Sequence, residues 1–160
     1  MSDQPSFEKI LASSLGNELT LREGQVLADI MSVHCLNDGE RLVAEGEDND
    51  SLFLLAEGKL NVISNINGQD VPVYAMQIGE CAGTRAFVDR TPRKATLQAE
   101  GKATVYALAP DAFEALLEKE PHIVYQVMRA LFRITHANLM RMNQETQQLS
   151  NYINKSHGRY

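Results

Sequence analysis

The segment from Gly83 to Thr96 holds the residue types best suited to chemistry, because it combines a glycine, four basic side chains and several small residues in an acidic chain. Glycine accepts backbone angles that other residues resist, and residues 85–89 can form one short helical turn whose first N–H groups bind an anion. The planar guanidinium of Arg93 can hold two phosphate oxygens at once. These residue types predict an anion cradle that suits a phosphate monoanion.

A solvated charge run is the alternative interpretation of the same segment. The basic side chains are Arg85, Arg90, Arg93 and Lys94. Exposed charges on a loop usually contribute little beyond solubility. The cradle therefore requires a scaffold that holds the side chain of Arg93 in place.

Short apolar runs between turn residues, from Leu36 to Leu108, predict that this scaffold is a series of strands. The predicted strands are Arg41–Ala44, Leu52–Ala56, Lys59–Ser64, Val71–Met76, Ala95–Gln98 and Ala103–Leu108. The pair Asn67-Gly68 is a strong signal for a hairpin. A spacing of about ten residues per strand is typical of a small antiparallel barrel or jelly roll. The strand pattern breaks between Gly83 and Arg90, where a ligand cradle would fit.

Helical patterns precede the strands, so the predicted fold class is α+β, mainly β. The first 35 residues predict one or two helices. An apolar pattern that begins at Phe7 is closed by Gly16, and Thr20 with Glu23 has the spacing of a capping box.

Two further helices are expected after residue 109. Asp111 with Glu114 has the spacing of a second capping box, and Pro121 suits the first position of a long helix that continues to residue 150. Residues 151–160 form a polar tail that is expected to be flexible. Along the long helix, residues at three-and-four spacing form a seam with polar interruptions. They are Val124, Met128, Leu131, Thr135, Asn138, Met142, Glu145 and Leu149.

Length and composition predict one domain overall, because 160 residues of which 44% are hydrophobic suit a single core. Its consecutive parts are the N-terminal helices (1–35), a β jelly-roll ligand-binding core (36–109), the C-terminal lid and dimerisation helices (110–150) and the tail (151–160).

Charge and targeting signals narrow the function classes. A net charge of −6 argues against a nucleic-acid-binding surface, which usually shows as a basic stripe. The N-terminus has no secretory pattern and no window reaches the ~20 apolar residues of a membrane span, so a cytoplasmic protein is expected. The two cysteines, Cys35 and Cys81, are expected to be reduced thiols.

Catalysis is not expected. The four histidines are scattered, and none lies in the strand region beyond His34, so no metal site of the cupin type is predicted. Neither a Ser-His-Asp arrangement nor a Walker-type lysine loop is recognisable. The sequence predicts a binding protein without a metal or cofactor.

Roughly residues 20–145 resemble the cyclic nucleotide-binding domain, the ligand module of catabolite-activator-type regulators, cyclic-nucleotide-dependent kinase subunits and gated channels. The phosphate-binding cassette of that family reads roughly Gly-Glu-Leu-Ala, five variable residues, Pro-Arg, a variable residue, then Ala-Thr or Ala-Ser. The matching cassette residues are Gly83, Ala86, Pro92, Arg93, Ala95 and Thr96. Further matches are Gly39, Leu42, Glu45-Gly46, the run Asp50-Ser51-Leu52-Phe53-Leu54-Leu55, Gly58 and Leu60.

The resemblance implies that Arg93, backbone amides and the hydroxyl of Thr96 hold a cyclic phosphate. Thr84 stands where the family has a glutamate that binds the ribose 2′-hydroxyl, and loss of that charged hydrogen bond weakens binding by roughly 10–100-fold. Arg85 stands where the family has an apolar residue. The candidate ligand-binding residues are Gly83, Thr84, Arg85, Ala86, Arg93, Lys94, Ala95 and Thr96.

The leading hypothesis is a stand-alone regulatory module that binds cyclic AMP, cyclic GMP or a related anionic nucleotide. By the resemblance, it forms a homodimer through its last helix and signals by movement of that helix to an unknown protein partner. Too few residues follow the long helix for a DNA-binding domain. The alternative is a degenerate module that binds no nucleotide and serves as a protein-interaction or dimerisation scaffold.

Overall fold

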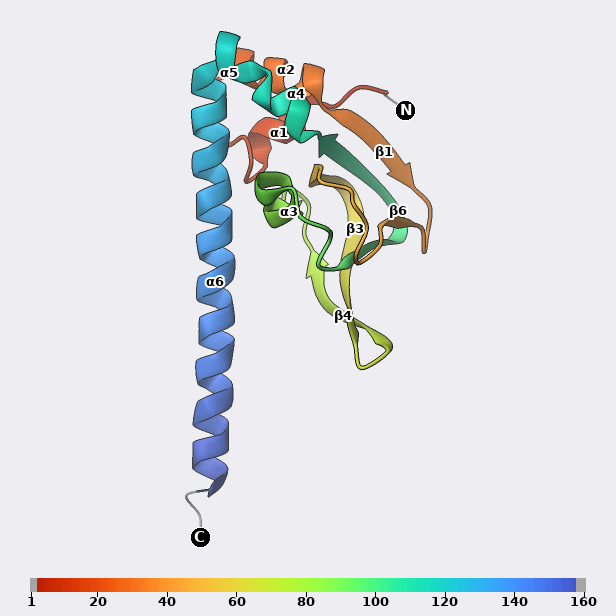
Figure 1. The fold of residues 1–160 in the computed structure, drawn as a ribbon, viewed down its shortest axis with the longest axis vertical. Coiled ribbons are helices and arrows are strands. Elements are labelled where there is room, and N and C mark those ends of the chain that lie inside the picture. Colours follow the sequence, from red (N-terminus) through yellow and green to blue (C-terminus); the bar gives the residue numbers. More distant parts are fainter. Residues whose placement is uncertain (1–2, 158–160) are drawn as a thin grey trace.

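The computed structural model describes residues 3–157 and combines an antiparallel sheet with short helices and one very long helix. The helices are α1 (Phe7–Ala12), α2 (Leu21–Ile30), α3 (Thr84–Asp89), α4 (Pro110–Glu114), α5 (Leu116–Lys119) and α6 (Pro121–His157). The strands are β1 (Ser32–Leu36), β2 (Arg41–Val43), β3 (Leu52–Ile66), β4 (Gln69–Met76), β5 (Cys81–Ala82) and β6 (Thr96–Leu108). Figure 1 shows α1, α2, α4 and α5 at one end of the sheet, with α6 running beside it.

The sheet has the strand order β1-β6-β3-β4, with β2 added to β6 and β5 added to β3. The two runs predicted as separate strands at residues 52–56 and 59–64 form one long strand, β3, whose register shifts around residue 57. Gly58 has φ +83°, and a Cβ there would overlap the carbonyl oxygen of Lys102. The bend that joins the two halves of β3 therefore requires glycine.

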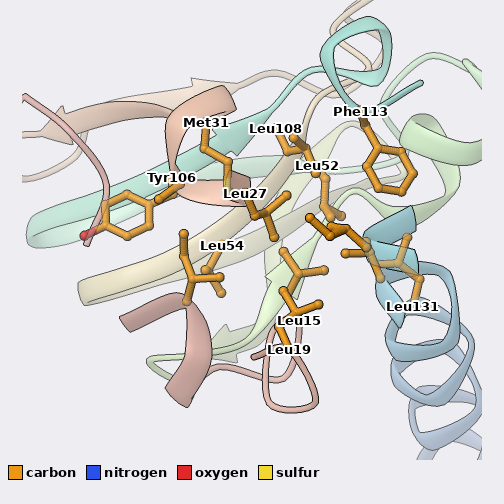
Figure 2. Packing of buried hydrophobic residues seen from close by; sticks show 14 of the residues in the cluster. Leu15, Leu19, Leu27, Met31, Leu52, Leu54, Tyr106, Leu108, Phe113 and Leu131 are labelled. Atoms are coloured by element: carbon orange, nitrogen blue, oxygen red, sulfur yellow. The ribbon is translucent and has the colours of Figure 1, made fainter. Parts of the chain in front are cut away.

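Side chains of β3 alternate between two hydrophobic clusters, as a strand buried on both faces requires. Leu52 and Leu54 pack toward the helices, where Figure 2 shows them with Leu15, Leu27 and Leu131. Phe53 and Leu55 point the other way, into an inner cluster between the strands. The buried members of this inner cluster are Leu36, Val43, Phe53, Leu55, Leu60, Met76, Leu97, Ala99, Ala103, Val105 and Ala107.

The capping box at the start of α2 is confirmed. Oγ1 of Thr20 accepts from the N–H of Glu23 (3.2 Å), and Oε1 of Glu23 accepts from the N–H of Thr20 (3.0 Å). The other carboxylate oxygen of Glu23 lies 2.7 Å from Nδ1 of His122. This residue therefore ties the start of α2 to the start of α6.

The second predicted capping box is wrong. The N-cap of α4 is Ala109, which has no side-chain hydrogen bond, and Pro110 opens the helix. Asp111 and Glu114 instead accept hydrogen bonds from Arg90, at 2.8 and 3.1 Å. The i, i+3 spacing places both carboxylates on one face of α4, where they meet a partner that is far away in the sequence.

Several element boundaries differ from the predicted ones. The first helix ends at Ala12 rather than at Gly16, and α2 ends at Ile30, so the N-terminal helical part does not reach residue 35. Residues 32–36 instead pair with residues 103–107 of β6 as strand β1. The long helix continues beyond residue 150 to His157, and residues 158–160 of the predicted tail lie outside the described residues.

The predicted seam of α6 divides into two parts. Val124 and Leu131 are buried in the helix-side cluster, whereas Met142 and Leu149 are exposed. Within residues 3–157 no helix has both the length and the hydropathy to cross a membrane. The same residues contain no cluster of three or more His, Cys, Asp or Glu side chains arranged for a metal ion.

We expect Glu23→Gln to lower the free energy of unfolding by roughly 1 kcal/mol at pH 7, the usual effect of weakening a cap. Burial alone would raise the pKa of Glu23. Hydrogen bonds from Thr20 and His122 lower this pKa by more than burial raises it, so it lies below the ordinary value of 4.5. Stabilisation from such a carboxylate is present above its unfolded pKa and is lost as the pH falls through its folded pKa.

Urea unfolding followed by circular dichroism, from about pH 6 down to about pH 3, measures the effect. The stability gap between the parent and Glu23→Gln should narrow as the pH falls below 4.5. Glu118→Gln, on the exposed part of α5, is the control and should open no gap. A stability difference between the parent and Glu23→Gln that stays constant across this pH range would contradict the role of the Glu23 carboxylate as a cap.

Candidate functional site

The side chain of Arg93 is the centre of the site, because it is a buried cation with only 5% of its surface exposed. Its Cζ lies 4.6 Å from the centre of the Phe53 ring. Nη2 donates to Oδ1 of Asn49 (3.2 Å) and to the carbonyl oxygen of Ser51. Nε and Nη1 are also buried but have no hydrogen-bond partner among the described residues. Two charged donors are thus held in place with capacity for an acceptor.

Gly83 makes the space into which Arg93 extends. It is the N-cap of α3 with φ +86°, and a Cβ at this position would overlap Nη1 of Arg93 and lie 3.2 Å from the carbonyl oxygen of Ser51. Strand β5 pairs with Phe53 and Leu54, and this pairing brings the following Gly83 beside the guanidinium. Glycine is required here both for the backbone angle and for the close approach.

The loop at residues 45–47 fixes the backbone of Arg93. The N–H of Gly46 donates to the carbonyl of Arg93 (2.8 Å), and the N–H of Arg93 donates to the carbonyl of Glu47 (3.0 Å). Oγ1 of Thr96 accepts from the N–H of Glu45 (2.9 Å). The buried Thr96 hydroxyl therefore holds this loop against the start of β6.

The other predicted site residues differ in their exposure and in their partners. Thr84 is half-buried at the first position of α3, and Ala86 is buried behind it. Arg85 is exposed and its Nε pairs with Oδ2 of Asp89 at 3.2 Å. Lys94 is exposed and Ala95 is half-buried. The geometry thus brings Gly83 and Arg93 together and turns Arg85 and Lys94 toward solvent.

The arrangement can bind one anion. The N–H of Phe87 donates to the carbonyl of Gly83 (3.0 Å), so the N–H groups of Thr84, Arg85 and Ala86 precede the first hydrogen bond of α3. Burial lowers the pKa of Arg93, and the carboxylates of Asp50 and Glu47 oppose this shift. A guanidinium remains charged under such a shift because its pKa is very high in water.

Arg90 links this site to the helices. It has φ +53° at the C-terminal end of α3, and its guanidinium lies 2.8 Å from Asp111, 3.1 Å from Glu114 and 3.8 Å from Asp50. Asp50 belongs to the segment that also supplies Asn49 and Ser51 to Arg93. Arg90 and Arg93 therefore contact the same loop, and Arg90 also connects that loop and α3 to α4.

Sequence reasoning missed the residues that position Arg93. Asn49, Ser51 and Phe53 lie in or beside the run from Asp50 to Leu55, for which the sequence indicated a family match and, from Leu52, a strand, but no contact with Arg93. The available signal was the pair of short polar residues immediately before a buried strand. Their partner is more than 40 residues away, as shown by separations of 44 and 42 residues for the two hydrogen bonds.

Comparison with known families identifies the class of protein. The family model for the cyclic nucleotide-binding domain matches residues 33–120, which is more than half of the chain and includes the site around Arg93. The chain belongs to the cyclic nucleotide-binding domain family.

Individual relatives agree with this result. The cGMP-dependent protein kinase of Eimeria tenella is 31% identical over 108 residues, which are 68% of this chain and 10% of the kinase. A cyclic nucleotide-binding domain from Methylobacillus flagellatus has a TM-score of 0.81 at 24% identity, over 87% of this chain and 81% of that one. The regulatory domain of Toxoplasma gondii PKA, solved with cAMP, has a TM-score of 0.62 at 25% identity, over 68% and 42%.

The chain spans only about a tenth of the Eimeria kinase and about a quarter of the cAMP-dependent kinase regulatory subunit of Yarrowia lipolytica, to which it is 30% identical over 101 residues. The structural matches confirm the predicted fold class, an antiparallel jelly roll with N-terminal helices and a long C-terminal helix.

We expect Gly83→Ala to destabilise the protein by more than the ~1 kcal/mol that a left-handed backbone angle costs a residue with a Cβ. The added Cβ would overlap Nη1 of Arg93, so the guanidinium must leave its position. Gly68→Ala is the matched control, because Gly68 has φ +84° with open space around it. Chemical unfolding should show a larger loss for Gly83→Ala, and equal losses would contradict the close packing.

Proposed function

We propose that this chain is a regulatory module that binds a cyclic nucleotide, cyclic AMP or cyclic GMP, by its phosphate at Arg93. The observation that carries the proposal is the pair of buried donors, Nε and Nη1 of Arg93, which have no partner among the described residues. A buried charged donor without an acceptor is costly, and a phosphate oxygen supplies that acceptor. The names of the relatives, a cGMP-dependent kinase and a regulatory domain solved with cAMP, support this ligand class.

The sugar end of the site sets the affinity. Thr84 occupies the position that, by resemblance to the family, holds a glutamate for the ribose 2′-hydroxyl. A threonine hydroxyl can accept the same hydrogen bond but without a full negative charge and with a shorter reach. We propose that binding is roughly 10–100-fold weaker than a charged partner would allow.

The proposed action is non-catalytic and proceeds through the helices. Arg90 connects α3 to α4, and α4 leads through α5 directly into α6. A ligand that favours one position of α3 therefore biases the position of α6, in proportion to its difference in affinity for the two states. An unidentified protein partner would read that position.

We expect Arg93→Lys to weaken the binding of cyclic AMP or cyclic GMP by roughly 10–100-fold, because one ammonium group cannot replace both free donors, Nε and Nη1, of the fixed guanidinium. Isothermal titration of the parent and the variant measures the change. The parent should also gain about 2.7 kcal/mol of stability at ~100 times the dissociation constant, a gain that Arg93→Lys should lose at the same concentration.

Arg85→Gln and Lys94→Gln are matched controls, since both side chains are exposed basic residues of the same segment. They should leave the affinity within about twofold. If the parent binds neither cyclic nucleotide at millimolar concentration, the proposal fails. The degenerate scaffold, which the threonine at position 84 favours, would then be the better assignment.

We further propose that two copies pair through residues 132–149 of α6. Phe132, Leu139, Met142 and Leu149 are 73, 53, 58 and 61% exposed. Phe132 and Leu139 are seven residues apart, as are Met142 and Leu149, so the four side chains follow a heptad seam on one face of the helix. A parallel second copy would bury this seam.

We expect the double variant Leu139→Glu with Met142→Glu to be monomeric, because it places four like charges along the proposed interface of the pair. Size-exclusion chromatography with light scattering measures the mass. The double variant Gln144→Glu with Gln147→Glu adds the same charge on the opposite side of the helix and should remain dimeric. A parent protein that is monomeric at all concentrations would rule out the pairing.

A further inference from the structure

The connection between α3 and β6 holds most of the buried polar atoms that have no partner. In residues 3–157, four buried side-chain nitrogen or oxygen atoms lack a hydrogen bond: Oγ1 of Thr91, Nε and Nη1 of Arg93, and Oε1 of Gln126. Three of the four belong to Thr91 and Arg93, two residues apart in this connection (Figure 1). Buried polar groups are nearly always paired, so three such atoms in one short segment indicate a binding site.

Thr91 and Arg93 point to the same side of the connection. Arg93 is buried and Thr91 is half-buried, whereas Pro92 and Lys94 are exposed. This alternation is that of an extended segment, in which side chains two residues apart lie on one side. A residue before proline favours extended backbone, and the N–H and carbonyl of Arg93 both bond to the loop at residues 46–47, as in a strand pair. The Thr91 hydroxyl therefore faces the interior that contains the Arg93 guanidinium.

The three unpaired atoms suit one group that accepts hydrogen bonds. A guanidinium offers donors and no acceptor, and a hydroxyl offers one donor of its own. Thr91 and Arg93 do not satisfy one another, because Oγ1, Nε and Nη1 all lack a partner among the described residues. A phosphate has several acceptor oxygens, so a single phosphate can accept from Arg93 and from the Thr91 hydroxyl at once.

Thr96, the other threonine of this segment, has a different role. Its Oγ1 already accepts from the N–H of Glu45 at 2.9 Å, so this hydroxyl fixes the loop against β6. The resemblance to the family gives Thr96 a contact with the phosphate, whereas position 91 is the last of the five variable residues of the cassette. The hydroxyl that has no structural bond is therefore the one to which the cassette pattern assigns no role.

We propose that Thr91 is a further ligand-binding residue of the site and that its hydroxyl donates a hydrogen bond to the phosphate held by Arg93. This inference rests on the proposed function and adds a neutral donor to the charged ones. A hydrogen bond to a charged acceptor is stronger than one between neutral groups, so one hydroxyl has a measurable effect on affinity.

We expect Thr91→Val to weaken the binding of cyclic AMP or cyclic GMP by roughly 5- to 30-fold, because valine keeps the shape and removes the donor. The same substitution should not destabilise the protein without ligand, since it removes a buried hydroxyl that has no partner. Its unfolding temperature should equal that of the parent or exceed it by up to about 4 °C. A purely structural role of Thr91 would not combine weaker binding with undiminished stability.

Isothermal titration with cyclic AMP, cyclic GMP and the base-free ribose 3′,5′-cyclic phosphate measures affinity, and thermal unfolding without ligand measures stability. The three ligands should lose affinity in Thr91→Val by the same factor, because they share the phosphate. Thr91→Ser keeps the hydroxyl and should bind within about threefold of the parent. Thr104→Val is the matched control for affinity, since Thr104 is a half-buried threonine of β6 that lies opposite Cys35 and Glu57, and it should bind like the parent.

Thr96→Val is the control for stability, because it leaves the N–H of Glu45 without its acceptor and should lower the unfolding temperature. An equally large fall in Thr91→Val would overturn the inference, as would a loss of affinity for only one of the two nucleotides. If Thr91→Val binds like the parent while Arg93→Lys loses binding, the inference fails and the proposed function stands. If the parent binds none of the three ligands, both fail together.

Discussion

The burial of one guanidinium, that of Arg93, is the constraint on which the rest of the site depends. A charge taken out of water is costly unless it gains partners. Here the partners are Asn49, the carbonyl of Ser51 and the face of the Phe53 ring. Asn49 and Ser51 lie just before β3 and Phe53 is its second residue, so the path of the chain into this strand positions all three partners. The missing Cβ of Gly83 then allows α3 to close over the guanidinium.

A second arginine transmits this arrangement beyond the site. Arg90 is 41% exposed, so its individual ion pairs with Asp50, Asp111 and Glu114 contribute little to stability. Their importance is geometric, because one planar group bridges the loop before β3, the end of α3 and the start of α4. Any shift of α3 against Arg93 must change the distances to α4. Electrostatic contacts of low individual strength suit this purpose, since they can rearrange without unfolding the core.

Local sequence patterns predicted most of the elements and the cassette, whereas the contacts within the site are non-local. The Thr20–Glu23 box was predictable because both partners lie within one helical turn. The same spacing at Asp111 and Glu114 misled, because the partner of these carboxylates is Arg90, 21 and 24 residues away. Spacing reports that two side chains share a face and does not report what faces them.

The long helix has a buried first part and an exposed second part, whereas the sequence pattern predicted a single seam along both. Its first turns bury Ile123, Val127 and Leu131 in the helix-side cluster and move only with that core. Beyond Ile134 every residue up to position 156 is exposed except Arg141, whose Cζ lies 4.4 Å from the centre of the Tyr74 ring on β4. A segment that buries little surface has a small free-energy difference between attached and detached positions, so a ligand with a modest difference in affinity can shift it. Tyr74, which Arg141 contacts, packs against the inner cluster, and the same cluster contains the Phe53 ring that lies against the guanidinium of Arg93.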